Sequence, residues 1–358
     1  MEMLMENRFI DRLDRNIENM KILVVFTGGT IGSSVNQDGY FAPDKRKAYK
    51  LLELYKRYRA NSHAAIPTPA GEEPMFDTAE PYTTLSENLG IEHLEMLIRC
   101  LEQNLAKDYD GIIVTHGSDT LQYTAAALGY TFGNDTIPIM LVASNYILDD
   151  MRANGLDNFA AAVDFICQQA GRGVFVSYRN TGEHTRYHRG TRLQGHPAHT
   201  DYLASVDNLF YASHQYGKVI KNREYKECED ALTSPVMSWD SLRTNVLWLQ
   251  AHPMMTFPKL DGNVKAILIS SYHSGTINTA SNRWNVYFRS AAESGIPVFL
   301  VGAADGMSYE STRGYRENGI QVLPKMAPIA AYMKLLMCTL NGLDLECCMF
   351  KSLGGDLL

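Results

Sequence analysis

The chain has 358 residues, of which 45% are hydrophobic and 20% charged, and its formal net charge is -7. This length suits a globular protein of two domains, and the negative charge argues against a protein that works by neutralising phosphates of nucleic acid. Without an apolar run long enough for a transmembrane helix or a signal peptide, we expect a cytoplasmic protein whose six scattered cysteines are reduced.

The first element in chain order is an expected accessory helix over residues 1–20. A buried strand at 22–26 follows, and it ends in the turn Thr27-Gly28-Gly29-Thr30-Ile31-Gly32. The polar stretch 33–43, which contains Tyr40, is expected to be a mobile loop. Ligands of open α/β sheets bind beyond the carboxyl ends of the strands, so the hydroxyl of Thr27 is placed to meet a ligand.

Strands and helices then alternate along the first half of the chain. Further strands are predicted at 111–114, 138–143 and 173–178, and helices at 45–59, 90–106, 121–130 and 155–170. Alternation of this kind is typical of right-handed βαβ crossovers and a parallel sheet with helices on both faces. The fold class is therefore α/β.

A polar stretch at 217–243 has few apolar residues and is interpreted as a linker. Beyond it, strands are predicted at 245–251, 264–270 and 298–302, with helices at 284–293 and 328–340. The expected organisation is a larger N-terminal parallel-sheet domain over 1–216 and a smaller C-terminal α/β domain over 244–358.

Two strand ends carry hydroxyl groups suited to nucleophilic chemistry. Thr27 follows the first strand, and the sequence Thr115-His116-Gly117-Ser118-Asp119-Thr120 follows the next clear one. A hydroxyl nucleophile needs a proton acceptor and donors for the oxyanion. Tyr40 is a candidate for the first role, and the amides of Gly28 or Gly117 for the second. Asp119 is also open to interpretation as an ordinary helix N-cap, and Tyr40 as a packing aromatic.

These two stretches together resemble the signature motifs of the bacterial-type L-asparaginase family. Gly39-Tyr40 follows the first motif at a spacing similar to that of the cytoplasmic type I branch. Arg189-Gly190-Thr191-Arg192 and Tyr272-His273-Ser274-Gly275-Thr276 resemble further family segments, so the resemblance runs from about residue 21 to about residue 340.

The resemblance implies roles for five residues in the hydrolysis of a side-chain amide, which releases ammonia without metal or cofactor. Thr27 would be the nucleophile and Tyr40 its partner, while Ser118 would be a second hydroxyl. Asp119 would bind the α-amino group of the substrate and Ser86 its α-carboxylate. The family also implies a homodimer or homotetramer.

Three departures from the family pattern bear on the substrate. Gly195 stands where the family has its catalytic lysine, Glu87 stands where a neutral residue is usual, and Thr276 replaces an asparagine. Arg192, His196 and His199 are candidates to replace the lysine. A carboxylate at Glu87 would repel a free α-carboxylate, unless it pairs with an amine of the ligand.

The sequence therefore predicts an asparaginase-like amidohydrolase. The alternatives are an amidase or acyl-transfer enzyme for a larger or derivatised amide, and a catalytically silent small-molecule-binding homologue. A tRNA-linked amidotransferase subunit is disfavoured by the short lead-in before the first strand. The histidines at 184, 188, 196 and 199 lack nearby cysteines and are interpreted as hydrogen-bonded rather than metal-binding.

Overall fold

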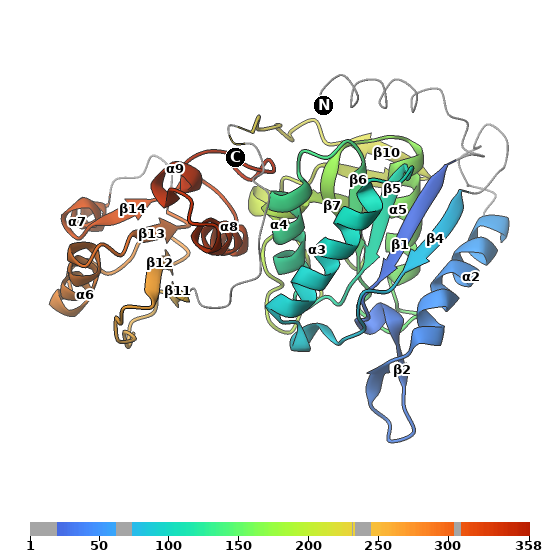
Figure 1. The fold of residues 1–358 in the computed structure, drawn as a ribbon, viewed down its shortest axis with the longest axis horizontal. Coiled ribbons are helices and arrows are strands. Elements are labelled where there is room, and N and C mark those ends of the chain that lie inside the picture. Colours follow the sequence, from blue (N-terminus) through green and yellow to red (C-terminus); the bar gives the residue numbers. More distant parts are fainter. Residues whose placement is uncertain (1–19, 62–73, 231, 233–244, 304–308) are drawn as a thin grey trace. The chain divides into compact units, whose positions relative to one another are not determined.

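The computed structural model describes residues 20–61, 74–230, 232, 245–303 and 309–358. The chain forms two compact units, Met1–Tyr225 and Lys226–Leu358 (Figure 1). The accessory helix expected over residues 1–20 lies outside the described residues except for Met20, and residues 231 and 233–243 of the expected linker lie outside them as well. None of the helices in the described ranges is long and apolar enough to cross a membrane.

The first unit is built on an eight-stranded sheet of order β10-β9-β8-β7-β6-β5-β1-β4. Its parallel half comprises β1 (Lys21–Phe26), β4 (Met75–Ala79), β5 (Gly111–Thr115), β6 (Pro138–Val142) and β7 (Gly173–Tyr178). The remaining strands are antiparallel: β8 (Thr185–Arg189), β9 (Ala212–Gln215) and β10 (Lys218–Lys221). The predicted strands at 22–26, 111–114, 138–143 and 173–178 are thus confirmed.

The first unit extends further along the chain than the expected boundary at residue 216. Strand β10 pairs with β9, which places residues 218–221 in the sheet instead of in a linker. Tyr216 and Gly217 connect the two strands with φ angles of 50° and 75°. Positive φ at both central residues is typical of a two-residue hairpin turn, but Tyr-Gly is an unusual sequence for it.

Helices cover both faces of this sheet (Figure 1). On one face, α2 (Lys45–Asn61) and α5 (Gly155–Cys167) pack with β1 through a buried cluster that includes Tyr55, Phe159 and Val24. The helices α3 (Ile91–Leu105) and α4 (Leu121–Phe132) lie on the other face. This arrangement places the carboxyl ends of β1, β5, β6 and β7 at the same end of the sheet, where the polar loops meet.

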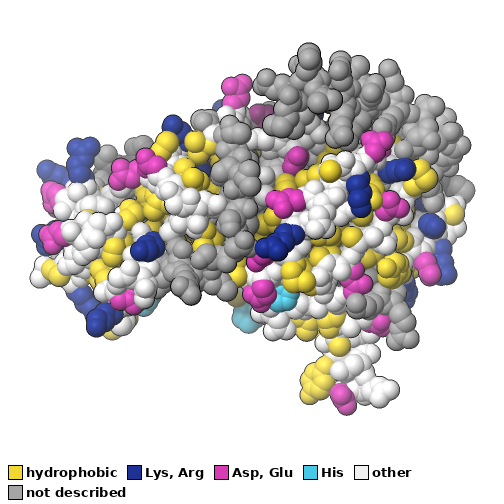
Figure 2. Space-filling view, viewed as in Figure 1, with side chains coloured by type: hydrophobic (Ala, Val, Ile, Leu, Met, Phe, Trp, Pro, Cys, Tyr) yellow, Lys and Arg dark blue, Asp and Glu magenta, His cyan; other side chains and the backbone are white. Residues whose placement is uncertain are grey.

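The stretch predicted as a loop at 33–43 is a hairpin instead. It consists of β2 (Ser33–Val35) and β3 (Phe41–Pro43), which pair antiparallel. Asn36 closes its turn, since its side-chain oxygen accepts hydrogen bonds from the amides of Asp38 and Tyr40. The hairpin projects from the first unit and carries apolar side chains near its tip (Figure 2).

The second unit has a parallel four-stranded sheet of order β11-β12-β13-β14. Its strands are β11 (Asn245–Gln250), β12 (Val264–Ser270), β13 (Val298–Val301) and β14 (Ile320–Val322). Its helices are α6 (Asn282–Glu293), α7 (Arg313–Glu317), α8 (Pro328–Leu340) and α9 (Leu345–Met349). The α/β fold class predicted for both parts of the chain is confirmed.

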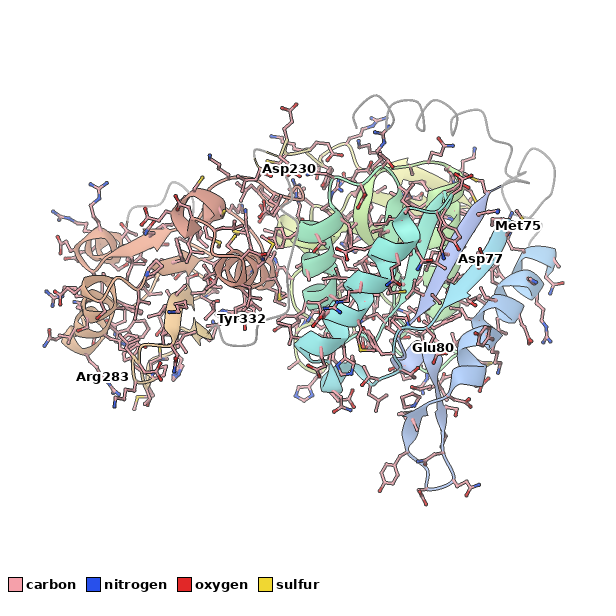
Figure 3. The ribbon with its side chains drawn as sticks, viewed as in Figure 1. Met75, Asp77, Glu80, Asp230, Arg283 and Tyr332 are labelled. Carbon is pink, nitrogen blue, oxygen red and sulfur yellow. The ribbon has the colours of Figure 1, made fainter. Side chains whose placement is uncertain are left out.

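The C-terminal residues are bound into this second unit by charged groups. Lys334 of α8 is fully buried and donates hydrogen bonds to the Lys351 carbonyl at 2.6 Å and to Asp356 at 2.8 Å. Asp230 accepts hydrogen bonds from the amides of Gly354 and Gly355. Figure 3 labels Asp230, and it also labels Tyr332 of α8, whose ring stacks on Trp248 of β11.

Candidate active site

Thr27 lies immediately beyond the carboxyl end of β1 and is 2% exposed. Its hydroxyl donates a 2.6 Å hydrogen bond to the carbonyl of Thr115, the last residue of the neighbouring strand β5. Because Oγ1 has given its hydrogen to this carbonyl, its lone pairs are directed elsewhere. The bond fixes the orientation of the hydroxyl that the family resemblance predicts to be the nucleophile.

Three loops interlock around Thr27, and glycines make the contact possible. A Cβ atom on Gly29 would lie 2.4 Å from the Gly117 nitrogen, and one on Gly117 would lie 2.5 Å from the Ser86 side chain. Gly28 has a φ of 100°, and a Cβ there would meet the carbonyl oxygen of Thr84 at 2.2 Å. The loops after β1, β4 and β5 therefore touch backbone to backbone.

The loop after β4 brings Ser86 to Asp119, which lies just before α4. Ser86 is buried, and its hydroxyl donates a 2.9 Å hydrogen bond to Oδ2 of Asp119. The Thr120 hydroxyl donates a second bond, of 3.1 Å, to the Ser86 carbonyl. Asp119 caps no backbone amide of α4, and its carboxylate is exposed to solvent. It is therefore free to bind a ligand as well as Ser86.

The remaining predicted site residues are placed as follows. Ser118 is partly exposed and adjoins Asp119, whereas Glu87 is exposed in the short 3-10 turn η3 (Ser86–Asn88). Figure 3 shows Glu80 at the carboxyl end of β4, where this loop begins. Within the described ranges, the amides of Gly28 and Gly117 donate to no acceptor, and both glycines are buried.

Tyr40 is not joined to this group. It is 72% exposed on the β2–β3 hairpin, and among the described residues its hydroxyl has no hydrogen-bond partner. The backbone of Tyr40 closes the hairpin turn with Asn36. A role for Tyr40 at Thr27 therefore requires the hairpin to move toward the strand ends.

His116 has a structural position in the same loop. Its Nδ1 donates a 2.8 Å hydrogen bond to the Gly117 carbonyl, and its Nε2 accepts a 2.9 Å bond from the Thr124 hydroxyl of α4. Burial lowers the pKa of His116 to about 4, and the bond to Gly117 opposes this shift. The imidazole is therefore neutral near pH 7 and holds the loop against α4.

Tyr82 lies beside Thr27 in the candidate site and was missed by sequence reasoning. It is 9% exposed, and its side chain interacts with that of Thr27, although its hydroxyl makes no hydrogen bond of standard geometry within the described residues. Burial raises the pKa of Tyr82 to about 12, so the phenol is neutral. The only signal in the sequence was an aromatic residue four positions before Ser86, which is too common to be diagnostic.

Three residues are candidates to replace the missing lysine, namely Arg192, His196 and His199, and their surroundings differ. Arg192 is buried with its guanidinium over the Tyr225 ring, and Gly195 and His199 are exposed. His196 is partly buried against Tyr178, at the end of β7. In the described parts of the chain, no group of three histidine, cysteine or acidic side chains is arranged to hold a metal ion.

Thr276 belongs to a tight turn of the second unit. The Tyr272 amide donates a 2.9 Å hydrogen bond to the Thr276 carbonyl, and the Ser274 and Thr276 hydroxyls lie 3.1 Å apart. These two hydroxyls form a small polar surface beyond the end of β12.

Comparison with known proteins connects this geometry to a family. A family model described as "Asparaginase, N-terminal" matches residues 21–223. A glutamyl-tRNA(Gln) amidotransferase subunit from Sulfolobus acidocaldarius is 24% identical over 347 residues, which are 92% of this chain and 73% of the relative. An L-asparaginase of Thermococcus kodakarensis is 25% identical over 338 residues, covering 91% of this chain and 95% of the relative.

Solved structures show the same fold. The thermostable L-asparaginase from Thermococcus kodakarensis superposes with a TM-score of 0.73 and 22% identity, covering 95% of this chain and 99% of that one. L-asparaginase I from Vibrio cholerae superposes with a TM-score of 0.74 and 19% identity, with the same coverages.

Proposed function

The chain belongs to the asparaginase family, and on that basis we propose that it hydrolyses a side-chain amide, with Thr27 as nucleophile and ammonia as first product. One observation carries the proposal: the loops after β1, β4 and β5 interlock so that Thr27, Ser86, Gly117 and Asp119 meet at one edge of the sheet. Nucleophile, substrate-binding carboxylate and free amides are what acyl transfer from an amide requires.

In this mechanism, Thr27 Oγ1 attacks the amide carbon of the substrate. The amides of Gly28 and Gly117 stabilise the oxyanion. The hydroxyl proton of Thr27 passes to the amide nitrogen, and the carbon–nitrogen bond then breaks to release ammonia and leave an ester on Thr27. Asp119 binds an amine of the substrate, with Ser86 holding the carboxylate in place at 2.9 Å. Tyr40 joins the site when the hairpin closes over bound substrate.

The altered residues around the site favour a substrate other than free asparagine. Glu87 is exposed in η3, directly after the Ser86 to which the family resemblance assigns the α-carboxylate. A second carboxylate there disfavours a free carboxylate by charge repulsion. The proposed substrate is therefore an amide with a blocked carboxyl group or an additional amine, such as a peptidyl asparagine.

A second candidate function is amide transfer, in which the ammonia passes to an acceptor. The similarity to a glutamyl-tRNA(Gln) amidotransferase component over 92% of the chain favours it. The sequence analysis argued against this function from the short segment before β1. The similarity over 92% of the chain is the stronger argument. For either function we propose a homodimer or homotetramer, as the family resemblance implies.

Ammonia release from L-asparagine, L-glutamine, N-acetyl-asparagine and asparaginyl dipeptides tests the proposal. We expect release from at least one of these amides and its loss in Thr27→Ala. Thr78→Ala is the matched control, since Thr78 is exposed on β4 of the same unit and should leave turnover unchanged. Turnover that persists in Thr27→Ala excludes Thr27 as nucleophile, and binding of an amide without turnover supports a silent homologue.

A further inference from the structure

The second unit contains a cavity of about 630 Å³ that the proposed function does not use. Gly275 and Ala303, which follow β12 and β13, line it together with residues of α7 and of β14, the strand at the edge of the sheet (Figure 1). Ligands of parallel sheets bind beyond the carboxyl ends of the strands, and cavities of about 300–1,000 Å³ hold small molecules. Both the position and the size of this cavity are therefore those of a ligand site.

The charge in the cavity is positive. Arg316 of α7 is exposed and is the one charged residue among the described residues that line it. In the described parts of the chain, no carboxylate lies within ion-pair distance of its guanidinium. A guanidinium matches a planar carboxylate with two parallel hydrogen bonds, and one cation balances one negative charge. The cavity therefore favours a monoanion.

Much of the remaining wall is apolar and reaches the solvent. Tyr309, Val322 and Phe350 line the cavity and are 38%, 40% and 39% exposed. The Phe350 ring is supported from behind by Phe299 of β13, with 6.4 Å between the ring centres. A ligand that covers these side chains removes apolar surface from water, which is favourable. The anion that fits the cavity therefore has an apolar body.

Hydrogen bonds hold other parts of the wall in place. The Tyr315 hydroxyl accepts a 3.3 Å bond from the Ile277 amide, and the Gln321 side chain donates a 2.7 Å bond to Glu346 of α9. Tyr315 is also buried in the core between the sheet and α6. The cavity is thus formed before a ligand arrives, which lowers the cost of binding.

We propose that this cavity binds a small monocarboxylate with an aromatic or aliphatic body. The carboxylate pairs with Arg316, and the body covers Tyr309, Val322 and Phe350. A phosphate ester fits less well, because it carries nearly two negative charges and the cavity supplies one cation. The proposal does not depend on the chemistry at Thr27, since every residue that lines the cavity belongs to the second unit.

Isothermal titration calorimetry with 3-phenylpropionate as the probe tests this site. We expect saturable binding of one ligand per chain. The alcohol 3-phenylpropan-1-ol has the same body without the charge, and acetate has the charge without the body. Both should bind about tenfold more weakly or less, and so should phenyl phosphate.

Arg316→Gln should weaken the binding of 3-phenylpropionate about tenfold or more, because it removes the charged hydrogen bonds. Arg313→Gln is the matched control and should bind as wild type, since Arg313 is exposed on the same helix but does not line the cavity. Phe350→Ala provides a second variant, which keeps the charge and should also bind more weakly. Unfolding midpoints of the three variants show that each is folded.

Three results would overturn the proposal. The first is the absence of saturable binding by wild type up to about 10 mM probe. The second is equal affinity of wild type and Arg316→Gln, which would place the probe elsewhere on the chain. The third is an affinity for the alcohol or for phenyl phosphate that equals or exceeds the affinity for 3-phenylpropionate, which would contradict the chemical class.

Discussion

The Ser86 hydroxyl donates a 2.9 Å hydrogen bond to Oδ2 of Asp119, joining the loop after β4 to the loop after β5. Asp119 is exposed, and its other carboxylate oxygen remains available to bind a ligand. Two residues on different loops therefore form one polar pair, which we propose as the substrate-binding group, and close contact of Gly117 with Ser86 constrains its geometry.

Removing the Ser86 hydroxyl should weaken substrate binding more than it slows the chemical step. A hydrogen bond to a charged group contributes about 1.5–3 kcal/mol, so we expect Ser86→Ala to raise KM by about tenfold or more. Steady-state kinetics of ammonia release measure this, with exposed Ser290→Ala of the second unit as control. A lower kcat at unchanged KM would show that Ser86 does not act through binding.

Alanine at Gly117 should separate the interlocked loops. Its Cβ would lie 2.5 Å from both Cβ and Oγ of Ser86, so one of the loops has to shift. We expect a loss of stability of about 1–3 kcal/mol and a larger relative loss of kcat/KM. Gly262→Ala is the control, because a Cβ at Gly262 meets no atom within 4 Å. Denaturant unfolding and ammonia release measure the two effects, and wild-type values for both would contradict the packing described.

Tyr82→Phe should affect activity but not stability. The Tyr82 hydroxyl is buried beside Thr27 without a standard hydrogen bond, so its removal costs the folded state nothing, whereas a bound substrate loses a donor. We expect an unchanged or higher unfolding midpoint, with kcat/KM lowered about tenfold. Tyr287→Phe is a matched control in the second unit, where another buried hydroxyl lacks a partner within the described structure. A lower midpoint with unchanged kcat/KM would assign Tyr82 a structural role.

His116 should make the protein less stable in acid. Its pKa is lowered from 6.5 to about 4 in the folded state, so between these values the unfolded chain binds a proton that the folded chain does not. This contribution to stability is present above pH 6.5 and decreases by up to about 1.4 kcal/mol per unit as the pH falls toward 4.

Denaturant unfolding of wild type and His116→Gln between pH 7 and pH 4 measures this contribution. The glutamine variant should show a shallower decrease, since it has no group to titrate. His188, whose pKa burial lowers to about 3, is retained in both proteins and cancels in the comparison. Equal slopes for the two proteins would mean that His116 has the same pKa in the folded and unfolded chains, which would contradict the shift.

The sequence predicted elements whose signal is local and strong. The apolar run of β1, the glycine pair after it and the alternation of strands and helices are properties of adjacent residues, and the structure has them where they were expected. Short polar strands were missed: β8 has the sequence TRYHR and β10 has KVIK. The pairing of β8 and β10 is set by neighbouring strands and by a Tyr-Gly turn. Neither can be recognised from the amino-acid composition of these short segments.

What the sequence by itself determined was the fold class, the family resemblance and the residue types available at the strand ends. Only the tertiary structure decided which of these meet. Ser86 reaches Asp119, Tyr82 reaches Thr27, and the His196 ring is oriented by Tyr202 and Tyr178, while Tyr40 stays on an exposed hairpin. The physical reason is that local sequence sets backbone conformation, whereas proximity across loops is set by sheet order and by close contact at Gly29 and Gly117.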